Sequence, residues 1–143
     1  MPATIVLGYD GSDGAKAALA QAEWLARDLG ASVVIAFGYA TNPMGGETRD
    51  EELAIQSMAA KATDEARERL AAAGIQTTVE IVHARPVEAL LAVAKEHDAR
   101  LIVVGTNGQG PVLGGILGSV PYRLVHQSTL PVLVVPAAGR SES

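Results

Sequence analysis

The chain has 143 residues, a formal net charge of −5 at pH 7, no cysteine, and 48% hydrophobic residues, few of them aromatic. This length suits one domain with a core of ordinary size, and the apolar content excludes a disordered chain. The acidic balance argues against a nucleic-acid partner, which would need a basic surface, and the lack of cysteine excludes disulfides and thiolate metal sites.

The chain carries no recognisable membrane or export signal. No apolar run approaches the length of a membrane span. The opening residues, MPATIVLGYD, lack a basic region followed by a cleavable apolar run. We therefore expect a cytoplasmic protein with no membrane partner.

The first half of the chain alternates strand and helix signals. Residues 4–9 are an apolar run with β-branched side chains, which predicts a strand buried on both faces. Ser12 is expected to cap a helix that ends at Gly30, and residues 32–39 form a second buried strand. Residues 40–49 are predicted to be a polar loop. A helix should follow from about residue 51 to 73, with an inner face of Ile55, Met58, Ala59, Ala62, Ala66 and Leu70.

The second half continues this alternation. Residues 77–82 are predicted to form an edge strand, and Pro86 suits the first turn of a third helix. LIVVG (101–105) and LPVLVVP (130–136) read as the fourth and fifth strands, separated by a short helix over 119–127. Strands that alternate with helices predict a single α/β domain, in which a parallel sheet is covered by helices on both faces.

The most unusual stretch is GTNGQGPVLGGILGSV, which holds six glycines between residues 105 and 118 and no charged residue. Ligands of open α/β sheets bind beyond the carboxyl ends of the strands, and both this loop and Asp10 follow strands at that edge. Glycines let backbone N–H groups approach an anion closely, and the helix starting at Ser119 adds the positive end of its dipole. The stretch predicts a phosphate-binding loop; the alternative is a connection that merely tolerates glycine.

The spacing of these glycines points to a known family. The loop lacks the Gly-Lys pair of a P-loop and the third glycine of a dinucleotide fingerprint, but it matches G-x2-G-x9-G-[ST] at Gly105, Gly108, Gly118 and Ser119. With the opening IVLGYDGSD, the LIVVGTNG turn and the closing LPVLVV, the chain resembles the universal stress protein family, specifically its ATP-binding branch. The resemblance covers nearly the whole chain. We expect residues 1–138 to form one domain of this kind and the polar residues 139–143 to form a flexible tail.

The resemblance implies a five-stranded parallel sheet in the order 3-2-1-4-5, like that of the adenine nucleotide α-hydrolase-like proteins, with ATP bound between strands one and four. Asp10 would contact the ribose or a phosphate-bound Mg²⁺, although it could instead only support the start of the helix. Gly8 and Gly38 would lie beside the adenine. Gly105 and Gly108 would flank the ribose and the α-phosphate.

At the phosphate end, the resemblance implies that Gly118, Ser119 and Val120 hold the β- and γ-phosphates through backbone N–H groups and the serine hydroxyl. Three positions depart from the family's pattern, and one of them, Arg100, stands where the family often has an acid. Val120 stands where many ATP-binding members have a second hydroxyl residue, and Pro121 has no N–H to offer.

The same residues bear on whether the protein is an enzyme. ATP hydrolysis needs a water-orienting base and a cation opposite the developing charge, and the loop supplies neither. One charge-assisted contact contributes about 1.5–3 kcal/mol, far below the ~8 kcal/mol or more of barrier lowering by enzymes. We therefore expect no catalytic residue and binding with slow turnover at most. The resemblance implies a nucleotide-linked stress regulator; the alternatives are a nucleotide-independent scaffold of the same fold and a slow ATPase or nucleotidyl transferase.

The fifth strand is strongly apolar and, in the family's strand order, lies at a sheet edge. An exposed apolar edge must be covered or paired. The resemblance implies a homodimer through this strand, with Val132, Val134 and Val135 at the contact.

The three histidines, His83, His97 and His126, are far apart in the sequence and have no acidic residues at metal-ligand spacing. Structural zinc sites need several such ligands together. We expect no metal site among them.

Overall fold

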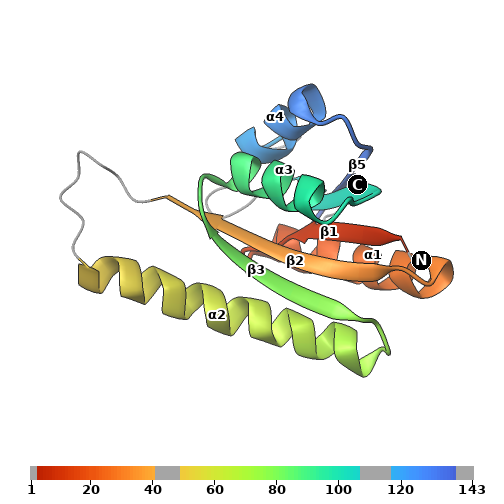
Figure 1. The fold of residues 1–143 in the computed structure, drawn as a ribbon, viewed down its shortest axis with the longest axis horizontal. Coiled ribbons are helices and arrows are strands. Elements are labelled where there is room, and N and C mark those ends of the chain that lie inside the picture. The colour runs from red at the N-terminus through yellow and green to blue at the C-terminus, as the bar shows by residue number, and fades with distance from the viewer. Residues whose placement is uncertain (1–2, 41–48, 107–116, 138–143) are drawn as a thin grey trace, which may run out of the picture.

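In a computed structural model of the protein, residues 3–40, 49–106 and 117–137 are described. The tail predicted at 139–143 lies outside these residues. Strands and helices alternate along the whole chain (Figure 1), in the order β1 (Thr4–Gly8), α1 (Asp13–Leu29), β2 (Ser32–Tyr39), α2 (Arg49–Ala72), β3 (Thr77–His83), α3 (Pro86–Glu96), β4 (Leu101–Gly105), α4 (Ser119–Gln127) and β5 (Val132–Val135).

The five strands form one parallel sheet in the order β3-β2-β1-β4-β5, as predicted. β1 lies at the centre and pairs with β2 on one side and β4 on the other. The strand order therefore runs outward from β1 to β3 on one side and from β4 to β5 on the other, so that it reverses between β1 and β4. In open α/β sheets this reversal leaves a crevice at the carboxyl edge.

The helices cover both faces of the sheet (Figure 1). α1 and α2 pack on one face over a core that includes Leu7, Ile35 and Leu70. α3 and α4 pack on the other face over a core that includes Val6 and Leu124. Neighbouring residues of β1 enter opposite cores because strand side chains alternate between faces. Each fully buried aliphatic side chain contributes about 1.5–3 kcal/mol.

The ends of α1 agree with the sequence prediction. The Ser12 Oγ accepts a hydrogen bond from the Ala15 N–H at 3.2 Å, and Gly30 ends the helix in the left-handed conformation with φ of 65°. The serine satisfies one of the unpaired donors of the first turn. Glycine adopts the positive φ without steric cost.

α2 departs from its prediction at its first half. It begins at Arg49, inside the predicted loop, because acidic residues 50–52 in its first turn interact favourably with the helix dipole. Met58, predicted to face inward, is 62% exposed, and residues 49–58 contain no buried residue. The buried residues of the helix, Ala59, Thr63, Ala66 and Leu70, begin only at Ala59. None of the described helices is long and apolar enough to cross a membrane.

Candidate functional site

A cleft of about 340 Å³ lies at the carboxyl edge of the sheet, where the strand order reverses. This volume lies within the range of small-molecule sites. Five segments line it: the end of β1 and its turn (Gly8, Tyr9, Asp10, Ser12, Ala15), the end of β2 (Ala36, Phe37, Gly38), the start of α3 (Pro86, Leu90), the end of β4 (Val104, Gly105) and the start of α4 (Gly118, Ser119, Val120, Pro121).

The fold brings the predicted site residues together from across the chain. Seven of the eight line the cleft: Gly8, Asp10, Gly38, Gly105, Gly118, Ser119 and Val120. The eighth, Gly108, lies outside the described residues. Sequence reasoning did not assign Pro86, Leu90 and Val104 to the site, where they add an apolar wall. They lie on a helix and a strand that were predicted, but only the packing of α3 on the sheet brings them together at this edge.

The described lining contains no lysine, arginine or histidine, and Asp10 is its one charged residue. Several anionic oxygens placed here would therefore meet no side-chain cation of the described lining. Their charge has to be balanced by backbone N–H groups, by the α4 dipole, or by a metal ion that arrives with the ligand.

Asp10 has a structural role as well as a place in the cleft. Its Oδ1 accepts a hydrogen bond from the Ser12 N–H at 3.0 Å, which orders the turn between β1 and α1. Gly11 stands in this turn with φ of 82°. The expected helix-supporting role and a position facing the cleft are thus both present in one side chain.

Tyr9 is nearly fully buried beside the cleft. Burial raises the pKa of its phenol, and the negative charges of Glu65 and Asp10 raise it further. The phenol therefore remains protonated near neutral pH and can act as a hydrogen-bond donor.

The start of α4 offers fewer phosphate donors than the sequence suggested. The Gly118 N–H, which we expected to bind phosphate, instead donates to the Thr106 carbonyl at 2.8 Å and ties α4 to the end of β4. Gly118 is the N-cap residue, and Pro121 has no N–H. Helix geometry leaves the N–H groups of Ser119 and Val120 as donors, together with the Ser119 hydroxyl.

Two site glycines are required by packing. A Cβ on Gly105 would lie 2.6 Å from the carbonyl carbon and oxygen of Gly14 in α1. A Cβ on Gly38 would lie 2.6 Å from the Cβ of Ala89 in α3. The absence of a side chain at Gly105 and Gly38 lets α1 and α3 pack closely on the strand ends that form the cleft. Sequence reasoning related Gly105 and Gly38 to a ligand alone; the glycine inside a predicted helix, Gly14, was the available signal of close packing.

The model that describes the universal stress protein family matches residues 1–136. The chain belongs to this family. A relative from Thermus aquaticus, named as the universal stress protein in the QAH/OAS sulfhydrylase 3′ region, is 37% identical over 134 residues, which cover 92% of this chain and 97% of the relative. The resemblance seen in the glycine spacing is therefore confirmed at the level of the family.

Solved structures of other proteins share this fold. The hypothetical protein MJ0577 superposes with a TM-score of 0.85 over 100% of this chain and 99% of its own, at 23% identity. A universal stress protein in complex with cAMP superposes with a TM-score of 0.74, at 33% identity, over 96% of this chain and 98% of its own. The first likeness concerns the fold alone, whereas the second structure was solved with an adenine nucleotide.

Proposed function

We propose that this universal stress protein binds an adenine nucleotide in the carboxyl-edge cleft and acts as a cytoplasmic, nucleotide-linked regulator in the stress response. The observation that carries the proposal is the convergence of Asp10, Ser119 and the first-turn N–H groups of α4 on one cleft at the strand reversal. The apolar wall from Leu90 and Val104 suits a flat base.

ATP with Mg²⁺ is the first candidate ligand. The Asp10 carboxylate is the one charged group of the described lining, and proteins commonly hold Mg²⁺ through one or two carboxylates together with substrate phosphates. Asp10 would hold the ion, and the ion would neutralise phosphate charge that no lysine or arginine of the described lining balances. Ser119 and the N–H group of Val120 would bind the phosphate oxygens.

A single-phosphate ligand, cAMP, is the second candidate. Because the Gly118 N–H is bonded to Thr106 and Pro121 has none, the start of α4 provides two N–H groups and one hydroxyl. This set suits one phosphate group better than three. The structure at 33% identity, solved in complex with cAMP, supports this choice.

We also propose a homodimer through β5. This strand pairs with β4 alone among the described strands and lies at the sheet edge. Val132 and Val134 are half-buried, so a second copy could cover them further, whereas Val135 is already buried in the protomer core and would contribute its backbone. A nucleotide-independent scaffold would keep this dimer and lose only the ligand.

A thermal-shift titration with ATP, ATP plus Mg²⁺, and cAMP distinguishes these functions, with light scattering on the same samples for the dimer. A ligand at 100 times its Kd stabilises the protein by about 2.7 kcal/mol. We expect Asp10→Asn to abolish the Mg²⁺-dependent part of the ATP shift, and the exposed Asp13→Asn, outside the cleft lining, to retain it.

Each other result has a defined meaning. A shift with cAMP that exceeds the shift with ATP and Mg²⁺ selects the single-phosphate ligand. If no nucleotide shifts the melting temperature, the nucleotide-independent scaffold is favoured. Release of ADP from ATP during the titration would indicate a slow ATPase. A monomer by light scattering contradicts the β5 dimer.

A further inference from the structure

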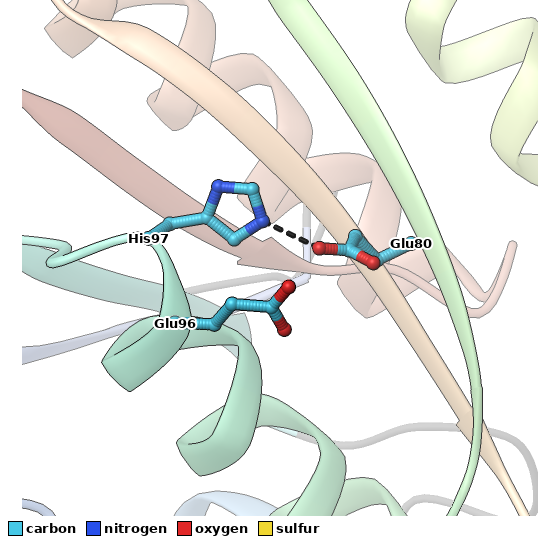
Figure 2. Close-up of side chains that lie close together, drawn as sticks. All are labelled: Glu80, Glu96 and His97. Atoms are coloured by element: carbon cyan, nitrogen blue, oxygen red, sulfur yellow. Dashed lines mark hydrogen bonds and ion pairs between the residues drawn. The ribbon is translucent and has the colours of Figure 1, made fainter.

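Figure 2 shows a second group of polar side chains, away from the cleft lining: Glu80 on β3, Glu96 at the end of α3, and His97 directly after it. One ligand atom from each residue lies within 4.8 Å of the other two. The His97 Nε2 lies 2.5 Å from the Glu80 Oε2. The expectation that the histidines lack acidic partners is therefore wrong for His97, because the fold supplies Glu80 from 17 residues earlier in the chain.

The fold holds both sides of this cluster in place. Glu80 lies on the sheet face that α3 covers, because side chains two residues apart in a strand share a face and Val82 packs into the α3 core. On the other side, the His97 N–H donates to the Val93 carbonyl at 3.0 Å, and the buried Ala99 donates to the Ala94 carbonyl at 2.9 Å. Asp98 closes this turn with φ of 50°.

The cluster brings two carboxylates to one imidazole. The His97 and Glu80 side chains are 27% and 29% exposed, so they are partly withdrawn from water. Within this cluster His97 pairs with Glu80, and Glu96 forms no ion pair with any described residue. Even a protonated imidazole balances only one of the two negative charges, and a divalent cation would balance both.

We propose that Glu80, Glu96 and His97 bind a zinc ion. Imidazole nitrogen and carboxylate oxygen are both zinc ligands, and three protein ligands leave a fourth position for water. The imidazole favours zinc over Mg²⁺ and Ca²⁺, which prefer oxygen alone. This site is separate from the nucleotide site, and the proposal does not depend on nucleotide binding.

The present spacing needs only small adjustments to accept the ion. Zinc–ligand distances near 2.1 Å place tetrahedral ligand atoms about 3.4 Å apart. The His97–Glu80 hydrogen bond therefore opens slightly as its two atoms bind the metal, while the exposed Glu96 side chain closes in by rotation. The imidazole binds in its neutral form. The ion would join the edge strand β3 to the end of α3.

The test is isothermal titration of ZnCl₂ into the chelator-treated full chain without nucleotide. We expect one zinc per chain. The affinity for zinc should fall at least about tenfold in each of His97→Gln, Glu80→Gln and Glu96→Gln, because loss of a group that only supports a metal ligand already lowers affinity by about this much. His126→Gln is the matched control, since His126 is exposed on α4 and contacts Tyr122. MgCl₂ titrated in the same way should bind more weakly than zinc.

Nitrogen-15 NMR of the imidazoles identifies the ligand directly. Zinc should shift the ring nitrogens of His97 and leave those of His83 and His126 unchanged. The proposal is overturned if zinc does not bind, if the three variants bind it as tightly as the wild type, or if the NMR shifts fall on another histidine.

Discussion

The two ends of α3 show two ways of building a site. Its start, at Pro86, lines the nucleotide cleft, and its end, at Glu96, belongs to the proposed zinc site, about 15 Å away at 1.5 Å per residue. The cleft is built largely from main chain, with closely packed glycines and helix N–H groups. The zinc cluster is built only from side chains that the sheet and the helix bring together. The cleft therefore depends on how closely the backbones of α1, α3 and the strand ends approach one another, whereas the zinc cluster depends on which side chains the fold brings together.

The largest expected effect is on the stability of the fold, and it comes from substitution of Gly105, where α1 packs closely on the end of β4. Gly105→Ala places a Cβ 2.6 Å from the backbone of Gly14, which cannot rotate away. We expect a loss of about 3 kcal/mol in the free energy of unfolding, at the upper end of ordinary overpacking. Urea denaturation measures it.

Gly8→Ala is the matched control for this substitution. Its Cβ would meet side-chain atoms, the Val104 Cγ1 at 2.9 Å and the Leu90 methyls beyond 3.0 Å, which can adjust. The loss should be about 1 kcal/mol, the low end of the same range. Equal losses in the two variants would contradict the distinction between backbone and side-chain neighbours.

A smaller effect, confined to binding, is expected at the phosphate end of the cleft. Ser119→Ala removes one hydroxyl donor, and a hydrogen bond to a charged group contributes about 1.5–3 kcal/mol, so nucleotide affinity should fall roughly tenfold or more. Stability should change by less than about 0.5 kcal/mol, because Ser119 is exposed and Gly118 is the N-cap. Calorimetric titration with nucleotide and urea denaturation measure the two quantities. Unchanged affinity would place the phosphate elsewhere.

The smallest effect is expected from an exposed ion pair that joins α3 to α4 beside the cleft. The Arg123 Nη2 donates to the Glu88 Oε1 at 2.9 Å, and this hydrogen bond lowers the pKa of the Glu88 carboxyl. Because the pKa is lower in the folded state, the pair's slight stabilisation is present above the unfolded pKa and is lost as pH falls through the folded one. Exposed pairs contribute little.

Arg123→Gln should raise the pKa of Glu88 toward its ordinary value, which a carbon-13 NMR titration of the carboxyl measures. Lys95→Gln is the control: Lys95 lies on the same helix as Glu88 but forms no ion pair with a described residue, so its loss should leave the pKa of Glu88 unchanged. A Glu88 pKa that stays low without Arg123 would show that another donor causes the shift.

Much of the fold could be predicted because local patterns agree with it. The β-branched run at 32–39, the strand at 101–105 and the helix at 119–127 have the predicted bounds. Met58 was predicted to face inward, but it is exposed, because helical periodicity marks an apolar stripe without telling how much of the helix reaches the sheet.

The candidate site divides in the same way. The glycine spacing and Asp10 could be placed at one edge, because parallel strands end at the same side of a sheet. The hydrogen bond from the Gly118 N–H to the Thr106 carbonyl could not be predicted, since it depends on how α4 is placed relative to β4.

By itself, the sequence determined the alternation of strands and helices and, through the spacing of its glycines, the family, since both depend on residues close together in the chain. Only the tertiary structure decided that Gly105 lies against Gly14 and that Glu80 meets His97. These contacts join segments far apart in the chain, and their distances depend on how helices and strands pack, which no local pattern records.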